Sequence, residues 1–403
     1  MTPTPLASSK LRSLAFLMVA QIAGMSLWFM SSAILPDMTA EAAISDSRQA
    51  LLSSAVQAGF VAGALASAIL GLPDRYDPRR LFALCAVGAS MANLSLLIST
   101  PGSDLAIAAR FATGALLAGV YPVGLKIAVG WGKDDRGLLV GILVGALTFG
   151  SAAPHLLALL GGADWRWTVS VASIAALAGG LLVLGSTLGP YHASSGHFDI
   201  RAIATAWTDR KVRLAYAGYL GHMWELYAMW AWIGVATTAS FSLTMVMAEA
   251  VTLGRIIAFG AIAAGGIACI IGGLYADRLG KETIALIALA VSCASALATA
   301  ASFGGPVWLT CICALVWGAS ILPDSAQFSA LVADHSPPDK AGSLMTFQTA
   351  LGFALTFLTV QVTPVLADAV SWPVVFSIMA LGPAFGIVAM LRLKHLTSTA
   401  AVR

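Results

Sequence analysis

Long apolar runs dominate this chain and restrict what it can fold into. The chain is 59% hydrophobic and 10% charged, whereas soluble domains carry about 25% charged residues. About 20 apolar residues cross a bilayer as a helix, and inside lipid a helix satisfies its own backbone hydrogen bonds. The sequence predicts an all-α membrane protein with twelve transmembrane helices, at residues 12–36, 48–71, 80–100, 103–130, 137–160, 167–188, 213–237, 248–273, 281–302, 306–330, 341–362 and 373–394.

The longest polar interruption divides these spans six and six. It covers residues 189–212 and ends in the basic pair Arg210 and Lys211. Its Pro, Gly, Ser and His content is typical of a linker. We therefore expect an N-terminal six-helix bundle at 1–188, a cytoplasmic linker at 189–212 and a C-terminal six-helix bundle at 213–403.

Basic residues predict the orientation of the spans. With a cytoplasmic N-terminus, the outer loops hold Arg48 and Arg166, three basic residues lie within spans, and the other 17 of the 22 are cytoplasmic. Short cytoplasmic loops carry such an excess of Lys and Arg. This predicts a multi-pass protein of the cell (inner) membrane with both termini cytoplasmic, and the short polar N-terminus is not typical of a cleaved signal peptide.

Cysteine usage predicts neither a metal nor a cofactor. The five cysteines all lie in apolar runs, without metal-ligand spacing, and are expected to be small packing residues: Cys85, Cys269, Cys293, Cys311 and Cys313. The small net charge of +3 gives no indication of nucleic-acid binding.

Several features recur at about half the chain length. The segment Gly273–Lys281, a predicted polar hairpin, echoes Gly71–Arg80, with Asp277 lying 203 positions after Asp74. Pro122 is answered by Pro323 201 positions later, and Trp165 by Trp372 207 positions later. These offsets indicate two similar halves.

The repeated loop resembles the signature of the major facilitator superfamily, roughly G-x-L-A-D-R-x-G-K/R. The second copy matches at Gly273, Asp277, Arg278, Gly280 and Lys281, while the first keeps Asp74 and Arg75 and departs elsewhere. Arg110 followed by Gly114 resembles the superfamily's fourth-span signature. The resemblance implies two pseudo-symmetric bundles and a transporter whose central cavity is lined mainly by spans one, four, seven and ten.

Motifs that are missing narrow the type of transport. The sequence has no ATP-binding P-loop, which predicts a secondary transporter rather than an enzyme. The fifth-span signature of drug exporters is not met, because Ala146 replaces its proline, and this favours symport. An efflux antiporter for small organic compounds and a transporter-like membrane sensor remain alternatives.

Proton coupling is predicted in the seventh span. His222 and Glu225 are three residues apart and so share a helix face. An ionisable residue at membrane depth is functional by default. We expect Glu225 to carry the proton and His222 to tune it; the alternative is a neutral glutamic acid hydrogen-bonded to a neighbouring helix, with His222 as a packing residue.

Five further residues are candidates for substrate binding. Arg110 and Arg255 are basic groups within spans, His155 follows a proline, and Trp224 and Tyr227 offer rings for a flat or sugar-like solute. Snorkelling and plain packing are the alternatives for these side chains. The balance of charges favours a small polar or anionic metabolite.

The gating candidates are Asp74, Arg75, Asp277 and Arg278 in the repeated loops, together with Lys126 and Asp324 near the repeated prolines. The resemblance implies that the two carboxylates of the loops face helix N-termini, and that Lys126 and Asp324 pair when the cytoplasmic side closes. The predicted protein is a monomeric proton-coupled symporter whose partners are a small-molecule substrate, protons and the lipid bilayer.

Overall fold

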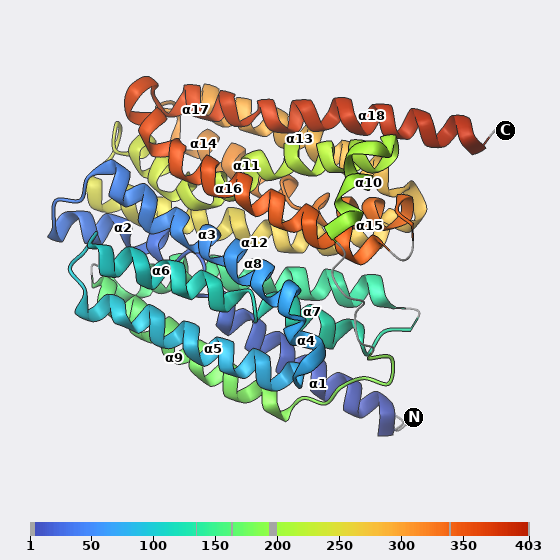
Figure 1. Ribbon diagram of the computed structural model, residues 1–403. Coiled ribbons are helices and arrows are strands. Elements are labelled where there is room, and N and C mark those ends of the chain that lie inside the picture. Colours follow the sequence, from blue (N-terminus) through green and yellow to red (C-terminus); the bar gives the residue numbers. More distant parts are fainter. Residues whose placement is uncertain (1–4, 134, 163, 193–199, 338–339, 402–403) are drawn as a thin grey trace. The chain divides into compact units, whose positions relative to one another are not determined.

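The computed structural model describes residues 5–133, 135–162, 164–192, 200–337 and 340–401, which form helices and turns with no strand among them (Figure 1). The all-α prediction is confirmed. The chain divides into two compact units, residues 1–195 and 196–403, and each is described by itself.

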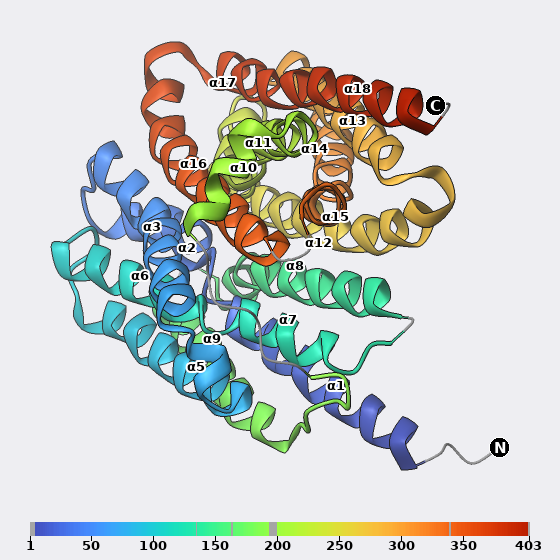
Figure 2. The same ribbon diagram turned by 45° about the vertical axis from the view of Figure 1, so that its right-hand side comes forward.

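The first unit contains nine α-helices and two short 3₁₀ helices in its described part. Helices α3 and α6 pack together, as do α5 and α9, while α1 lies against α8 and α9 (Figures 1 and 2). The bounds are α1 Pro5–Met25, α2 Met30–Glu41, α3 Asp46–Leu70, α4 Leu72–Arg75, α5 Pro78–Leu94, η1 Ser95–Ile98, α6 Asp104–Leu117, α7 Tyr121–Val129, α8 Arg136–Gly161, α9 Trp165–Leu182 and η2 Val183–Gly185.

The second unit is organised around α11, which contacts α12, α16 and α18. Asp209 caps the start of α11 by accepting hydrogen bonds from the backbone N–H groups of Lys211 and Val212, as an N-cap residue does. The bounds are η3 Ile200–Ala202, α10 Ile203–Thr208, α11 Arg210–Phe241, α12 Met247–Leu279, α13 Lys281–Ser302, α14 Val307–Ser320, α15 Ser325–His335, α16 Ala341–Val370, α17 Trp372–Met379 and α18 Leu381–Ala401.

Eleven segments of the described chain are long and apolar enough to cross a membrane. They coincide with eleven of the twelve predicted spans. The remaining span, 213–237, lies within α11, which is 32 residues long. His222, Glu225 and several aromatic residues lower the mean hydropathy of α11, and the same residues supply its chemistry.

The first, fourth and tenth spans are each interrupted by three or four non-helical residues. The interruptions lie at 26–29 between α1 and α2, at 118–120 between α6 and α7, and at 321–324 between α14 and α15. The last two are next to Pro122 and at Pro323, the prolines that recur at half-length. Backbone N–H groups here still donate to carbonyls three or four residues earlier, as Val120 does to Leu117 and Ile321 to Trp317. A helix end nevertheless leaves carbonyl groups without intrahelical donors, and these can accept from side chains.

The repeated loops differ from the predicted hairpins. The segment at 273–281 is not a hairpin: α12 continues to Leu279, and the chain turns at Gly280, whose φ of 87° suits glycine. No residue before Gly280 stops the helix. In the first copy α3 ends at Leu70, Gly71 takes a φ of 62°, and the single-turn helix α4 follows.

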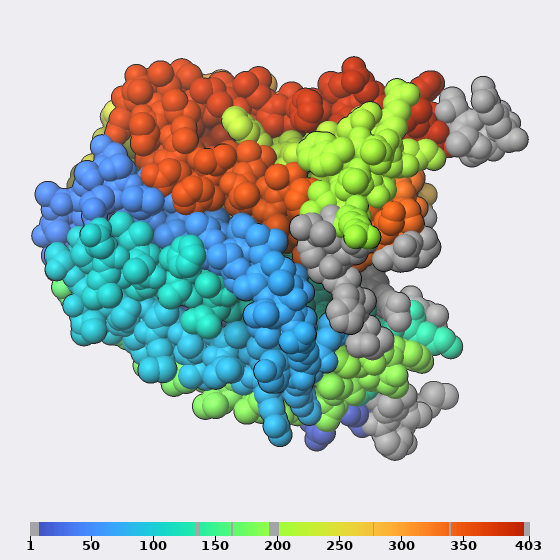
Figure 3. Space-filling model, viewed as in Figure 1, coloured from blue at the N-terminus to red at the C-terminus, as the bar shows by residue number. Residues whose placement is uncertain are grey.

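The segment expected to be a linker is ordered at both of its described ends. Near the first unit, Trp131 Nε1 donates to the carbonyl of Thr187 at 3.0 Å, and the backbone N–H of Tyr191 donates to the carbonyl of Gly130 at 3.0 Å. At the other end α10 packs on α11 and α16, and Figure 3 shows it as a light-green surface beside the orange of α16. Residues 193–199 lie outside the described part of the chain.

Small residues bring α3 and α6 into backbone contact. A Cβ atom added at Gly59 would lie 1.9 Å from the carbonyl oxygen of Phe111, and one at Gly114 would lie 2.0 Å from that of Val56. Helix pairs in membranes associate through small residues of this kind. The second of these glycines belongs to the fourth-span signature, so its role in this structure is close packing.

Gly59→Ala should therefore destabilise the first unit, because the added methyl group meets backbone that cannot move aside. Overpacking costs about 1–3 kcal/mol or more, and thermal unfolding of the purified protein should show a lower midpoint. Gly141→Ala is the matched control, since a Cβ there has nothing within 4 Å. Equal midpoints for the two variants would contradict the close-packing role of Gly59.

Candidate functional site

Two residues of α11 place acid–base chemistry inside the second unit. His222 and Glu225 are 0% and 1% exposed. Their spacing of three puts both on one face of α11, as predicted. Burial of an ionisable group disfavours its charged form unless hydrogen bonds or opposite charges compensate, so the partners of these two side chains decide what they can do.

Glu225 accepts a hydrogen bond on each carboxylate oxygen. Ser292 Oγ on α13 donates to Oε1 at 2.6 Å, and Trp317 Nε1 on α14 donates to Oε2 at 3.0 Å. Both donors are buried. The carboxyl group is therefore held by two helices other than its own, and sequence reasoning did not identify either donor.

His222 lies against a second acid. Its Nδ1 atom is 2.9 Å from Oδ1 of Asp324, and both side chains are buried. Asp324 stands at the break in the tenth span and precedes α15, where the helix N-terminus favours negative charge. The ring centroids of Tyr219 and Phe328 lie 6.2 Å and 5.7 Å from the centroid of the imidazole ring. We predicted instead that His222 acts on Glu225 and that Asp324 pairs with Lys126.

The second unit thus buries two carboxyl groups and an imidazole: His222 and Asp324 lie 2.9 Å apart, and Glu225 follows His222 by three residues on α11. We call Glu225, His222 and Asp324 the acid cluster. Two carboxylates and one imidazole, all removed from water, gain from sharing protons, because isolated buried charge costs several kcal/mol. Within the described residues no group of three or more His, Cys, Asp or Glu has an arrangement that could hold a metal ion. Carboxyl and imidazole groups are side chains that can bind and release protons.

Arg110 organises a separate polar network in the first unit. Its Nη2 atom donates to the carbonyl oxygens of Leu27 at 2.8 Å and Trp28 at 2.7 Å, and Nη1 donates to Oδ1 of Asn93 at 2.7 Å. Asn93 Nδ2 in turn donates to Ser173 Oγ at 3.0 Å. The guanidinium is 0% exposed.

This arrangement explains how the buried cation of Arg110 is held. Leu27 and Trp28 lie in the break after α1, where carbonyl groups lack intrahelical donors and the helix C-terminus carries partial negative charge. Arg110 was predicted to bind substrate; in this structure its Nη groups bind the break in the first span, and its role in substrate binding stays a prediction.

The other predicted substrate contacts are buried or packed within their own units. Trp224 Nε1 donates to the carbonyl of Ile378 at 3.0 Å, which directs its ring toward α17. The Tyr227 ring lies 5.1 Å from that of Phe353 on α16. His155 on α8 is 2% exposed, and Arg255 on α12 is 8% exposed.

Comparison with known proteins identifies the family of this chain. The profile of the Major Facilitator Superfamily matches residues 17–359. The chain belongs to this superfamily. A solved structure of a mutant of the nucleoside transporter NupG is similar in fold, with a TM-score of 0.73 and 14% sequence identity over 94% of this chain and 99% of that chain. The comparison with curated proteins gives no match.

As a member of this superfamily, the protein is a multi-pass membrane protein and a secondary transporter. Its partners are a small-molecule substrate and the lipids of the bilayer. The low identity to NupG restricts that likeness to the fold. The acid cluster and the Arg110 network therefore have to be interpreted from their own geometry.

The superfamily loop of the first half contacts the fourth span. Lys126 on α7 forms an ion pair with Asp74 and donates to the carbonyl of Pro73 at 3.1 Å. Asp74 was predicted to face a helix N-terminus, and Lys126 to pair with Asp324. In the structure Lys126 pairs with Asp74 in the first unit, and Asp324 pairs with His222 in the second. The Lys126–Asp324 gate stays a prediction, and it would require Lys126 and Asp324 to leave these partners.

The remaining loop candidates are at the surface or not described. Arg75 and Arg278 are exposed. The side chain of Asp277 lies outside the described part of the structure, so its predicted contact with a helix N-terminus is untested.

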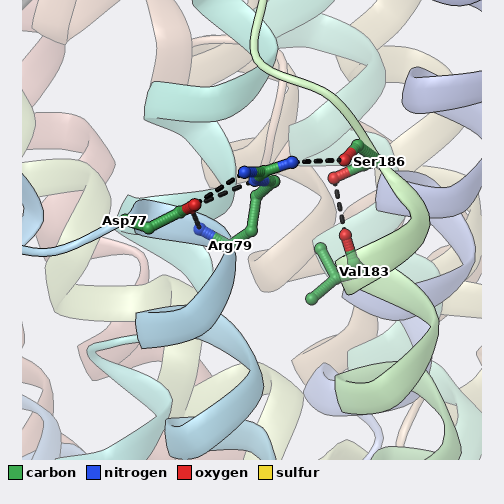
Figure 4. A network of polar contacts seen from close by, with 4 residues as sticks. All are labelled: Asp77, Arg79, Val183 and Ser186. Atoms are coloured by element: carbon green, nitrogen blue, oxygen red, sulfur yellow. Dashed lines mark hydrogen bonds and ion pairs between the residues drawn. The ribbon is translucent and has the colours of Figure 1, made fainter.

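A neighbouring contact ties the start of α5 to the segment after α9 (Figure 4). Arg79 Nη2 lies 2.6 Å from Asp77 Oδ2, and Arg79 Nη1 donates to the carbonyl of Ser186 at 3.0 Å. Ser186 Oγ donates to the carbonyl of Val183 at 2.6 Å. The hydrogen bond from Arg79 holds the pKa of Asp77 below its ordinary value. Asp77 stands where the superfamily signature has glycine, and it caps α5 by accepting a hydrogen bond from the backbone N–H of Arg79 at 2.9 Å.

Asp77→Asn should lower stability at neutral pH and have no effect in strong acid. Because the pKa of Asp77 is lowered in the folded state, its contribution is present above the ordinary value of about 3.9 and is lost as pH falls through the folded-state value. Partial exposure limits the effect to below about 1 kcal/mol. Thermal unfolding across pH measures it, and a difference between variant and wild type that persists in acid would contradict the assignment.

Proposed function

We propose that the protein is a proton-coupled symporter that moves a small polar metabolite across the cytoplasmic membrane by alternating access. The observation that carries this proposal is the acid cluster. Glu225 is 1% exposed, accepts two hydrogen bonds and lies three residues after His222, which pairs with Asp324.

Protons are the coupling ion that suits this cluster best. A carboxyl group at membrane depth is costly when charged, and a proton removes that charge without needing a coordination shell. Imidazole changes its charge near neutral pH, so His222 is suited to pass or balance a proton beside Asp324. Glu225 is the proposed proton carrier, and His222 with Asp324 tunes it.

The distribution of basic residues supports a cytoplasmic location for both termini. In that orientation the contacts among Lys126, Asp74, Asp77 and Arg79 lie at the cytoplasmic ends of their helices. We propose that these contacts, together with Arg75, Asp277 and Arg278, hold the cytoplasmic side closed and are released when it opens. We also propose that the protein acts as a monomer in the inner membrane.

A neutral polar solute fits the described side chains better than an anion does. The Nη groups of Arg110 are bound to protein oxygens, while two carboxyl groups of the second unit would repel negative charge. Tyr227 and Trp224 remain candidates for stacking on a flat ring. Nucleosides, the solutes for which the transporter NupG is named, are the first class to test, followed by sugars and small carboxylic acids.

The experiment begins with the purified protein and this panel. A ligand that binds the folded state raises the unfolding midpoint, by about 2.7 kcal/mol of stability at 100 times its dissociation constant. Compounds that stabilise the protein are then tested for uptake into proteoliposomes under an imposed pH gradient. We expect accumulation on the alkaline side. Accumulation on the acidic side would indicate the efflux antiporter instead, and stabilisation without any flux would indicate the sensor.

A further inference from the structure

The two side chains that donate to Glu225 lie at different places in their helices: Trp317 is near the end of α14, and Ser292 is in the middle of α13. Trp317 lies in the last turn of α14, four residues before Ile321 in the break of the tenth span. Its ring packs edge-on against Phe376 with centroids 5.3 Å apart. Ser292 lies in the middle of α13, a continuous helix. The indole bond therefore depends on where the end of α14 stands relative to α11, and the hydroxyl bond does not.

Asp324 at the start of α15 and Cys293 on α13 interact electrostatically with Glu225, and His222 precedes it by three residues on α11. His222 and Asp324 form their own close pair, and Cys293 Sγ donates to the carbonyl of Ala380 at 3.4 Å. Among the described residues neither oxygen of Glu225 has an Arg or Lys partner, so Ser292 and Trp317 are the groups that stabilise its charged form.

We propose that Trp317 and Ser292 are positioning residues that favour the charged form of Glu225, and that displacement of the end of α14 promotes proton uptake by withdrawing the indole. Donors to a carboxylate favour its charged form, and hydrogen bonds to charged groups are stronger than neutral ones. Loss of the indole bond leaves Glu225 with one donor, and the carboxyl group then binds a proton at higher pH. The break at 321–324 is thereby connected to proton loading. This inference rests on the proposed role of Glu225 as proton carrier.

The test measures the protonation of Glu225 directly and needs no substrate. Infrared spectra of the purified, reconstituted protein are recorded across pH, and the protonated-carboxyl band of Glu225 is assigned by its absence in Glu225→Gln. Trp317→Phe removes the indole donor but keeps an aromatic ring against Phe376. Ser292→Ala removes the hydroxyl donor. Each should move the midpoint of the Glu225 band to higher pH by about one unit.

Matched controls separate this effect from general disturbance. Trp232→Phe removes an equally buried indole of α11 whose Nε1 donates to the carbonyl of Val360 at 3.0 Å. Ser90→Ala removes a buried hydroxyl that donates to the carbonyl of Ser173 at 2.7 Å. Both controls should leave the Glu225 midpoint in place.

Three outcomes decide the inference. A shift to higher pH in Trp317→Phe and Ser292→Ala, with none in the controls, supports it. Unchanged midpoints in both variants overturn it, and so do equal shifts in the controls. The titration of Glu225 is measured independently of transport. A shift of its midpoint without proton-driven transport would support this inference and contradict the proposed function. Proton-driven transport without a shift would support the proposed function and contradict this inference.

Discussion

Glu225→Gln should abolish the accumulation of solute against its gradient while leaving exchange of solute across the membrane intact. Glutamine has the shape of protonated glutamic acid and keeps an acceptor for Ser292 or Trp317, but it cannot release a proton. Reorientation of the loaded carrier should therefore continue, and the step that depends on proton release should stop. Accumulation under a pH gradient and exchange of labelled for unlabelled solute, both in proteoliposomes, measure the two activities separately.

The matched control for this change is Glu249→Gln. Glu249 is an exposed residue in the first turn of α12, so the same chemical change there should leave both activities at the wild-type level. Concentrative uptake by Glu225→Gln would show that another group carries the proton. Loss of exchange as well as accumulation would show that the residue holds the structure or the substrate.

Arg110→Lys should disrupt the hydrogen bonds of Arg110 at the interruption of the first span, lower the stability of the protein and stop transport. A guanidinium reaches Asn93 and the carbonyls of Leu27 and Trp28 at once, whereas an ammonium is a compact charge that cannot match this fork. Losing one or two hydrogen bonds from a charged group that stays buried should cost about 2–4 kcal/mol. A fall in the thermal unfolding midpoint of the purified protein, together with loss of exchange, is the expected result.

Arg166→Lys provides the comparison for the same substitution at the surface. Arg166 binds both carboxylate oxygens of Glu41, at 2.6 and 2.8 Å, and both side chains are exposed. Exposed ion pairs contribute about 0–1 kcal/mol, so this variant should unfold close to the wild-type midpoint. If Arg110→Lys kept wild-type stability and activity, the contacts at Leu27 and Trp28 would have no part in holding the first span.

The fold was predictable because lipid imposes length and apolarity on each span. The predicted ninth span, 281–302, has the same bounds as α13. The interruptions at 26–29, 118–120 and 321–324 were not predicted, although Pro122 and Pro323 were noted. A proline shows that a hydrogen bond is missing, but whether the helix then bends or breaks depends on which side chains satisfy the freed backbone groups.

The site was predictable in part for a similar reason. An ionisable residue stands out in an apolar run, so Glu225, His222, Asp324 and Arg110 could all be singled out. Their partners could not, because Ser292 and Trp317 lie 67 and 92 positions from Glu225, and serine and tryptophan are unremarkable inside a membrane helix. The pairing of His222 with Asp324 depends on how α11 packs against the tenth span, which spacing along the chain does not specify.

Proton movement itself is the quantity that tests the central claim most directly. Proteoliposomes without any imposed gradient are given a solute identified by thermal stabilisation, and the pH of a weakly buffered medium is followed. Symport through Glu225 predicts that the medium becomes alkaline as solute enters, that a protonophore abolishes the change, and that Glu225→Gln shows none. Solute entry into wild-type vesicles with no change in the pH of the medium would contradict proton-coupled transport.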